Sequence, residues 1–177
     1  MKQVIIGVVL LSLIAPLVAS SLLELKGYTI GSAFTWEQRT TFSRCSSSES
    51  LGDYCFGTNV SLGNHNAKNI LVLYKDDKVT GVSVSFSASA FEQIADAFIL
   101  KYGKPTKVVE SAVKNRMGAK FRQVEITWIG PDNDTQLQLT LRSTDLDTSS
   151  VQLSSMRAVN EFARKKKEQN RKAAGNL

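Results

Sequence analysis

Three stretches of the chain alternate apolar and polar residues, and this alternation constrains the fold more than any other feature. In "VSVSF", Val82, Val84 and Phe86 fall on one face of an extended strand, and the two serines between them fall on the other. The stretches "VEITW" and "LQLTL" repeat the pattern. A period of two with one apolar face is typical of an antiparallel sheet that packs one face on a core. We therefore expect such a sheet.

Turn sequences separate the expected strands. A tight turn at residues 75–78 divides one pair of strands, and "GPDND" at residues 130–134 divides another. Asp, Asn, Gly and Pro favour turns because they tolerate or preset the backbone angles that turns need. An earlier strand is expected over residues 54–62, and "SVQLSS" predicts a last short strand at residues 150–155.

The stretch "SAFEQIADAFILKYGKP" predicts a helix over residues 90–102. Ser89 and Glu92 match a capping box at its start. Gly103 and Pro105 are typical of the end of a helix. Apolar residues recur at helical spacing and predict one buried stripe: Phe91, Ile94, Ala95, Phe98, Ile99 and Tyr102.

The predicted order gives the fold class. A short helix opens at "TWEQ", where Thr35 and Gln38 match a second capping box, and three strands follow it. The helix at 90–102, four strands and a C-terminal helix complete the chain. We expect an α+β fold in residues 21–155, with an antiparallel sheet, helices packed on one face, and a basic helix or tail at residues 156–177. In this order each half is a helix followed by a strand meander, but the sequence identity between the halves is too slight to predict a duplication.

The N-terminus predicts export. Lys2 precedes an apolar run from Val4 to Val18, and small residues follow it. This is the pattern of a secretory signal peptide over residues 1–20, with cleavage expected before Ser20 or Ser21. The alternative is an uncleaved membrane anchor, because the run is about long enough to cross a bilayer. Both interpretations place the body of the protein outside the cytoplasm, in the periplasm or secreted, with tethering to the inner membrane in the second.

The two cysteines agree with export. Cys45 and Cys55 bracket the loop-like stretch "CSSSESLGDYC". An even pair this close in an oxidising compartment is expected to form a disulfide. A redox pair would more usually be CxxC, and a metal site needs more ligands than two cysteines and His65 offer.

Most of the net positive charge lies at the C-terminal end. The chain has 22 Lys and Arg against 16 Asp and Glu, a net charge of +6. Residues 156–177 carry +5 of it, and residues 21–155 are neutral. A nucleic-acid-binding domain spreads its basic residues over a docking face. We therefore expect no nucleic-acid partner.

Three interpretations of the basic tail remain open. It is a solvated extension, a contact for an anionic membrane surface, or a docking arm for an acidic protein partner. Met156, Val159 and Phe162 form a short apolar stripe before the charges, so a frayed helix or a disordered tail is expected. The residues assigned to anionic-surface contact are Arg164, Lys165, Lys166, Lys167, Arg171 and Lys172.

The opening of the domain carries a resemblance. In "GYTIGSAFTWEQ" a glycine precedes a short capped helix, and a strand meander follows. Residues 24–155 in this respect resemble small exported α+β modules of the β-lactamase-inhibitor-protein type and the small lipoprotein of the outer-membrane barrel-assembly machine. The lipoprotein cysteine of the second group is absent. Such families bind proteins and do not catalyse, so the resemblance implies a binding function.

Catalytic motifs are missing from the sequence. It contains no GxSxG, Walker loop, GxGxxG or HExxH pattern. His65 is the single histidine, and it lies in the turn-like "GNHN", where we expect it to be exposed. The paired acids Asp76–Asp77 and Asp132–Asp134 are explained by turns, and "PDNDT" lacks the glycine and final Glu of a calcium loop. We expect no cofactor and no metal.

Four aromatic residues near the disulfide are the candidate contacts for a partner: Trp36, Tyr54, Phe56 and Tyr74. Exposed aromatics beside a stapled loop suit a protein-binding anchor, and ordinary core packing is the alternative.

Three functions follow from the sequence. The first is an exported, non-enzymatic protein that binds or inhibits an envelope or extracellular protein. The second is an exported hydrolase whose carboxylates are dispersed in sequence. The third is a membrane-tethered envelope factor of a mobile element, which requires that the N-terminal segment stay uncleaved. The missing motifs favour the first.

Overall fold

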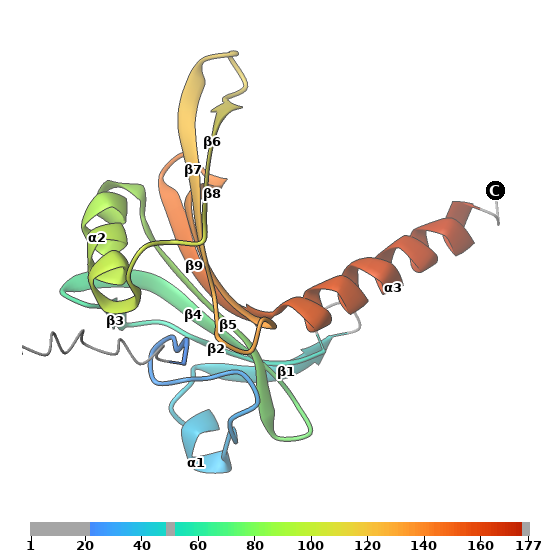
Figure 1. The fold of residues 1–177 in the computed structure, drawn as a ribbon. Helices are drawn as coiled ribbons and strands as arrows, with labels where there is room; N and C mark the ends of the chain where they lie inside the picture. Colours follow the sequence, from blue (N-terminus) through green and yellow to red (C-terminus); the bar gives the residue numbers. More distant parts are fainter. Residues whose placement is uncertain (1–21, 49–51, 175–177) are drawn as a thin grey trace, which may run out of the picture.

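The computed structural model describes residues 22–48 and 52–174. Within them, nine strands form one sheet in which all paired strands are antiparallel, together with a few helices (Figure 1). The elements in chain order are α1 (Trp36–Arg39), β1 (Arg44–Ser48), β2 (Gly52–Gly57), β3 (Val60–Leu62), β4 (His65–Lys75), β5 (Lys78–Ser87), the 3-10 turn η1 (Ala88–Ala90), α2 (Phe91–Tyr102), β6 (Lys107–Lys114), β7 (Lys120–Ile129), β8 (Thr135–Asp145), β9 (Thr148–Ser155) and α3 (Met156–Ala174).

The strand order reveals two meanders. It runs β1-β2-β4-β5-β9-β8-β7-β6, and β3 pairs only with β4 beside this path. Each half of the chain thus contributes a helix and four strands of this path, which advance from an outer edge toward the centre; β3 is a fifth strand of the first half and lies beside the path. The last strands of the two halves, β5 and β9, pair with one another there. This arrangement agrees with the expected succession of a helix and a strand meander in each half.

Alternation along the strands creates one buried face. The register aligns residues from β2 to β7 in a single row across the sheet: Cys55, Val72, Val82, Leu153, Leu137 and Trp128. All six side chains are at most 3% exposed. The alternation in "VSVSF", "VEITW" and "LQLTL" therefore predicted the sheet and its buried face correctly.

Helix α2 covers part of this face. Phe91, Ile94, Ala95 and Phe98 are its buried residues, and the Phe98 ring lies 6.1 Å from that of Trp128 in β7, centroid to centroid. The predicted helix over residues 90–102 is confirmed to within one residue.

The end of α2 follows the prediction, but its start does not. Gly103 ends the helix with φ of 76°, in a region that favours glycine. The predicted capping box is wrong: the helix has no side-chain cap, and the Ser89 hydroxyl instead lies 2.9 Å from that of Ser87. Ile99, expected in the buried stripe, is exposed.

The segment before β1 covers the other end of the core. Phe34 is fully buried, and its ring lies 5.1 to 5.9 Å from the rings of Tyr28, Phe42 and Tyr74. The backbone N–H of Phe34 donates to the carbonyl of Asp77 at 2.8 Å, which ties the segment to the β4–β5 turn. The capping box expected at the start of α1 is present.

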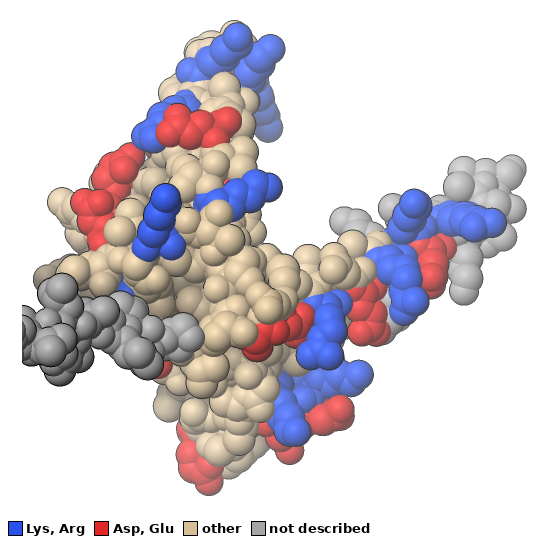
Figure 2. Space-filling model, viewed as in Figure 1, with Lys and Arg blue, Asp and Glu red and all other residues tan. Residues whose placement is uncertain are grey.

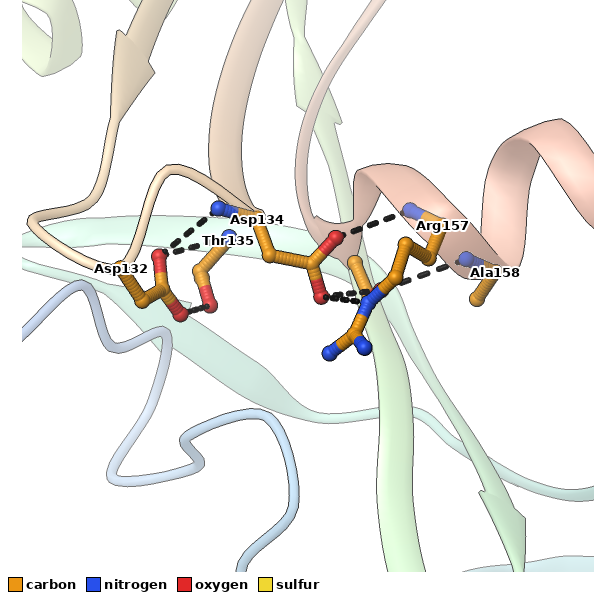
Figure 3. A network of polar contacts seen from close by, with 6 residues as sticks. Asp132, Asp134, Thr135, Arg157 and Ala158 are labelled. Atoms are coloured by element: carbon orange, nitrogen blue, oxygen red, sulfur yellow. Dashed lines mark hydrogen bonds and ion pairs between the residues drawn. The ribbon is translucent and has the colours of Figure 1, made fainter.

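Helix α3 leaves the sheet at the end of β9 (Figure 1). A carboxylate in the β7–β8 turn fixes its first residues (Figure 3). Asp134 accepts hydrogen bonds from the backbone N–H of Arg157 at 2.9 Å and from the Ser155 hydroxyl at 2.8 Å. The Ser155 hydroxyl in turn accepts from the N–H of Ala158 at 3.2 Å. These bonds satisfy donors that a helix start leaves without intrahelical partners.

The coarse prediction of an antiparallel sheet with a few helices is confirmed. The finer prediction, that the helices pack together on one face of the sheet, is not confirmed. Only α2 brings buried side chains to the sheet, since α1 has none and the side chains described in α3 are at most half-buried. Among the described residues, no helix is long and apolar enough to span a membrane. The signal peptide or anchor expected at residues 1–20 lies outside the described residues.

Strand boundaries in the first half differ from the prediction. Residues 44–48, expected in a loop, form β1, which pairs with β2. The strand expected over residues 54–62 is two strands, β2 and β3, and Asn59 between them has φ of 57°. The turn at residues 75–78 is confirmed, with Asp76 and Asp77 both at positive φ, as a tight hairpin turn requires. In the second half, β6 is the strand that the prediction did not place.

Candidate functional site

The sheet has a second face that points away from α2. One row on this face runs from β2 through β4, β5, β9 and β8 to β7: Phe56, Leu71, Ser83, Gln152, Gln138 and Thr127. We call this the open face, because α2 lies on the opposite side of the sheet and α3 runs away from it (Figure 1). A period of two along each strand places these side chains here, since their neighbours in the chain point into the core.

The end of the open face near the disulfide is apolar. Tyr54 and Phe56 of β2 lie directly opposite Leu73 and Leu71 of β4, and all four side chains are half-buried. Gly81 of β5 lies opposite Leu73, and a Cβ atom there would come within 3.3 Å of a Leu73 methyl group. The glycine therefore gives the leucine room to lie over the neighbouring strand.

The centre of the open face is polar and almost uncharged. The side-chain amide of Gln136 lies 3.3 Å from the hydroxyl of Ser154 on the neighbouring strand. The amide of Gln138 donates to Glu125 at 3.3 Å. Amides and hydroxyls lose less on leaving water than charged groups do, so this surface can be covered by a partner at low cost.

Charged side chains gather elsewhere. In Figure 2 the surface between the β6–β7 hairpin and α3 is mostly tan, whereas groups of Lys and Arg lie at the hairpin tip, along α3 and below α3. The centres of protein interfaces are depleted of charged residues in the same way.

The disulfide borders the apolar end of the open face. Cys45 and Cys55 are bonded and lie directly opposite one another on β1 and β2, with Cα atoms 4.0 Å apart. Cys55 is fully buried, whereas Cys45 is exposed at the edge of the sheet. The predicted bond is present, and it fastens the outermost strand to its neighbour.

The four predicted aromatic contacts fall into two pairs. Tyr54 and Phe56 lie on the open face. Trp36 and Tyr74 line a shallow pocket of about 260 Å³ beside α1. Trp36 is 72% exposed, but Tyr74 packs on Phe34 and lies under the Arg39 guanidinium, whose carbon is 4.4 Å from its ring centroid.

The sequence reasoning missed Leu71 and Leu73. Both belong to the run "NILVLY", which reads as a buried strand because apolar residues follow one another without alternation. Only the pairing of β4 with β2 and β5 shows that these two leucines lie on the open face. The absence of alternation in an antiparallel strand was the available signal, since it indicates apolar side chains on both faces.

A pocket of about 400 Å³ lies between α2, residues 24–26 and the β3–β4 turn. Apolar side chains that include Leu62 and Phe98 line it, and Lys101 and Glu24 form an ion pair at 2.6 Å on its rim. Partial burial is the largest single influence and acts to lower the pKa of Lys101, but the hydrogen bonds to Glu24 and Tyr102 and the attraction of their charges together outweigh it, so the pKa is raised. Its charged form is thereby stabilised.

His65 also lines this pocket. It begins β4 opposite Leu62 and is half-buried, so the prediction of an exposed turn residue is wrong. Residues 62–65 form a tight hairpin, and the strand begins at the histidine instead of after it. In the described part of the chain, no group of three His, Cys, Asp or Glu side chains is placed to hold a metal ion.

The paired acids serve the turns in which they were predicted. Asp132 accepts hydrogen bonds from the hydroxyl and the N–H of Thr135 at 2.6 and 2.8 Å, and these bonds lower its pKa. The N–H of Arg157, followed by the Ser155 hydroxyl, lowers the pKa of Asp134. Both carboxylates are therefore engaged in fixing turns and the start of α3.

The basic residues assigned to anionic-surface contact all lie within α3. Arg164, Lys167 and Arg171 are exposed along the helix. The backbone of Lys165, Lys166 and Lys172 is helical, but their side chains lie outside the described part of the structure.

Comparison with known proteins finds no family model, no curated protein and no solved structure that matches the chain. The resemblance to small exported binding modules therefore stays a prediction.

Proposed function

We propose that this protein is an exported, non-enzymatic binding protein and that its open face docks another envelope or extracellular protein. The observation that carries the proposal is the composition of that face. An apolar cluster lies beside a surface of uncharged Ser, Thr and Gln side chains. The cluster consists of the half-buried residues Tyr54, Phe56, Leu71 and Leu73. An apolar and aromatic cluster beside polar groups that can form hydrogen bonds has the anatomy of a protein interface.

The covalent chemistry supports the proposed location. A disulfide in the native fold suits an oxidising compartment, because thiols in the cytosol are kept reduced. This agrees with the export expected from the N-terminal sequence.

The 400 Å³ pocket beside α2 gives little support to hydrolysis. Glycoside hydrolysis, for example, needs two carboxylates that face one substrate. Glu24 is the acid among the residues that line the 400 Å³ pocket, and it is ion-paired with Lys101. A binding function does not require two carboxylates that face one substrate, so we favour the binding function over hydrolysis.

The proposal is tested by site-specific cross-linking. A photoreactive amino acid replaces Leu71 or Gln138 on the open face, and a matched variant carries it at Leu100, which is 90% exposed on α2. After illumination in the envelope, we expect one defined adduct from both open-face positions and none from position 100. Equal adducts from all three positions, or adducts from position 100 alone, would contradict the proposal.

Affinity for the captured partner provides the quantitative test. Replacing Phe56 or Leu71 by Ser is expected to weaken binding by more than about tenfold, because apolar anchors dominate interface energy. Leu100→Ser is the control and should leave binding unchanged. Thermal unfolding of each variant shows that a loss of binding does not result from a loss of fold.

A further inference from the structure

The tip of the β6–β7 hairpin combines three cations with an exposed apolar side chain. Residues 114–120 read "KNRMGAK", so Lys114, Arg116 and Lys120 surround Met117 and no acid lies among them. Met117 is 89% exposed. The hairpin projects from the body of the molecule (Figure 1), and Lys and Arg cover its end (Figure 2).

Hydrogen bonds hold the tip in one conformation. The side-chain oxygen of Asn115 accepts from the N–H groups of Met117 at 3.0 Å and Ala119 at 2.9 Å. The N–H of Gly118 donates to the carbonyl of Asn115 at 3.0 Å, and Gly118 has φ of 84°. Met117 is therefore presented at the apex without the entropic cost of ordering a loose loop on binding.

The charge of the tip is not cancelled by nearby acids. Glu110 is the preceding acid on β6, four residues before Lys114, which corresponds to roughly 13 Å along a strand. That separation exceeds the screening length of about 8 Å at physiological ionic strength. Glu110 is also paired with Arg122 at 2.9 Å. Asp145 lines a pocket together with Lys114, but its carboxylate accepts hydrogen bonds from the N–H of Asp147 and the hydroxyl of Thr148. The tip therefore keeps a net positive charge.

We propose that this tip is a membrane-docking element for anionic phospholipids. Lys114, Arg116 and Lys120 would contact the headgroup phosphates while Met117 enters the apolar layer beneath them. A bilayer is favoured over nucleic acid or an acidic protein because it offers both an anionic surface and an apolar interior directly below it. The long Lys and Arg side chains can keep their charges at the headgroups while the apex goes deeper. The element is separate from the open face and from the basic helix α3.

Vesicle binding of the full chain tests the charge contribution. The probe is vesicles of equal parts phosphatidylglycerol and phosphatidylcholine, compared with pure phosphatidylcholine. Each cation near such a surface strengthens binding about fivefold at low ionic strength. The triple variant Lys114→Gln, Arg116→Gln, Lys120→Gln is therefore expected to bind the anionic vesicles on the order of 100-fold more weakly than the parent.

A matched variant separates the tip from net charge. Lys26→Gln, Lys75→Gln, Lys78→Gln removes the same charge from three lysines exposed elsewhere, and we expect it to bind nearly as well as the parent. A third variant, Arg164→Gln, Lys167→Gln, Arg171→Gln, measures the share of α3. We expect its loss of vesicle binding to be additional to the loss in the tip variant, so that a variant with both sets of substitutions binds more weakly than either alone.

The depth of residue 117 in the bilayer is a second measurement, and binding through charge alone would not bury this residue. In a Trp36→Phe background, Met117→Trp is expected to show a blue-shifted emission on anionic vesicles and quenching by brominated acyl chains. Equal loss of binding in the tip and control variants, or no quenching at position 117, would overturn the proposal. Binding of an acidic protein or a nucleic acid through the tip, without binding to vesicles, would overturn it as well.

Discussion

The carboxylate of Asp134 joins the β7–β8 turn to the first residues of α3 by accepting both the backbone N–H and the side-chain Nε of Arg157, at 2.9 and 3.1 Å. The two residues lie 23 positions apart in sequence. An acid in a turn thereby caps a helix from outside it and ties the first turn of α3 to the β7–β8 turn (Figure 3). Negative charge at a helix start is also favoured by the helix dipole.

We predict that Asp134→Ala loosens the start of α3 without unfolding the sheet. Amide hydrogen exchange at residue 157 should become several-fold faster, because its N–H loses its acceptor, whereas the N–H of Met156 keeps its bond to the backbone carbonyl of residue 134. Arg157→Ala is the matched control: its side chain is 88% exposed and its backbone N–H bond to Asp134 is retained. An equal effect of the two substitutions would show that the ion pair, and not the cap, holds the helix.

We predict that acid destabilises the β7–β8 turn through Asp132. Hydrogen bonds from Thr135 lower the pKa of this carboxyl below its ordinary value of 3.8. The folded state therefore gains stability from Asp132 above pH 3.8 and loses it as the pH falls through the lowered pKa. Thr135→Val should move the pKa of Asp132 back toward 3.8, as measured by NMR titration. An unchanged pKa in that variant would contradict the assigned cause.

We predict that the disulfide stabilises the edge of the sheet. Closing a loop of about ten residues contributes about 2.5–3 kcal/mol to the free energy of unfolding. The double variant Cys45→Ala, Cys55→Ala should lose about that amount, measured by denaturant unfolding, and exchange should accelerate first in β1. Reduction of the parent protein should reproduce the variant. Labelling of both thiols by a thiol reagent under native, non-reducing conditions would refute the bond.

The sequence predicted two kinds of feature correctly: strands whose apolar and polar residues alternate, and helix ends marked by residues such as glycine. The alternation of Val82, Val84 and Phe86 predicted β5, and Gly103 predicted the end of α2. Both patterns depend only on neighbours within a few residues. The capping box predicted at Ser89 did not form. Ser89 lies inside the 3-10 turn η1, which Ser87 caps, so Ala90 takes the N-cap position of α2. Glu92 pairs instead with Arg122 of β7 at 3.1 Å, which no local pattern reveals.

The strands at the two edges of the sheet, β1 and β6, were not predicted, and the physical reason is the same for both. β1 has no buried side chain, and neither has β6. An edge strand that buries nothing carries no alternation of apolar and polar residues. β1 is defined by its pairing and by the disulfide, and β6 by its pairing with β7. The open face was likewise hidden, since Leu71 and Phe56 meet only after β2 and β4 have paired.

We predict opposite consequences for two aromatic residues of the N-terminal segment. Phe34 is fully buried among three other rings, so Phe34→Ala should lower the free energy of unfolding by about 3–5 kcal/mol through lost burial and the cavity left behind. Trp36, two residues later, is 72% exposed, so Trp36→Ala should change it by less than about 0.5 kcal/mol. Denaturant unfolding of the two variants in parallel measures both. A large loss of stability in Trp36→Ala would place that ring in the core and remove it from the candidate contacts for a partner.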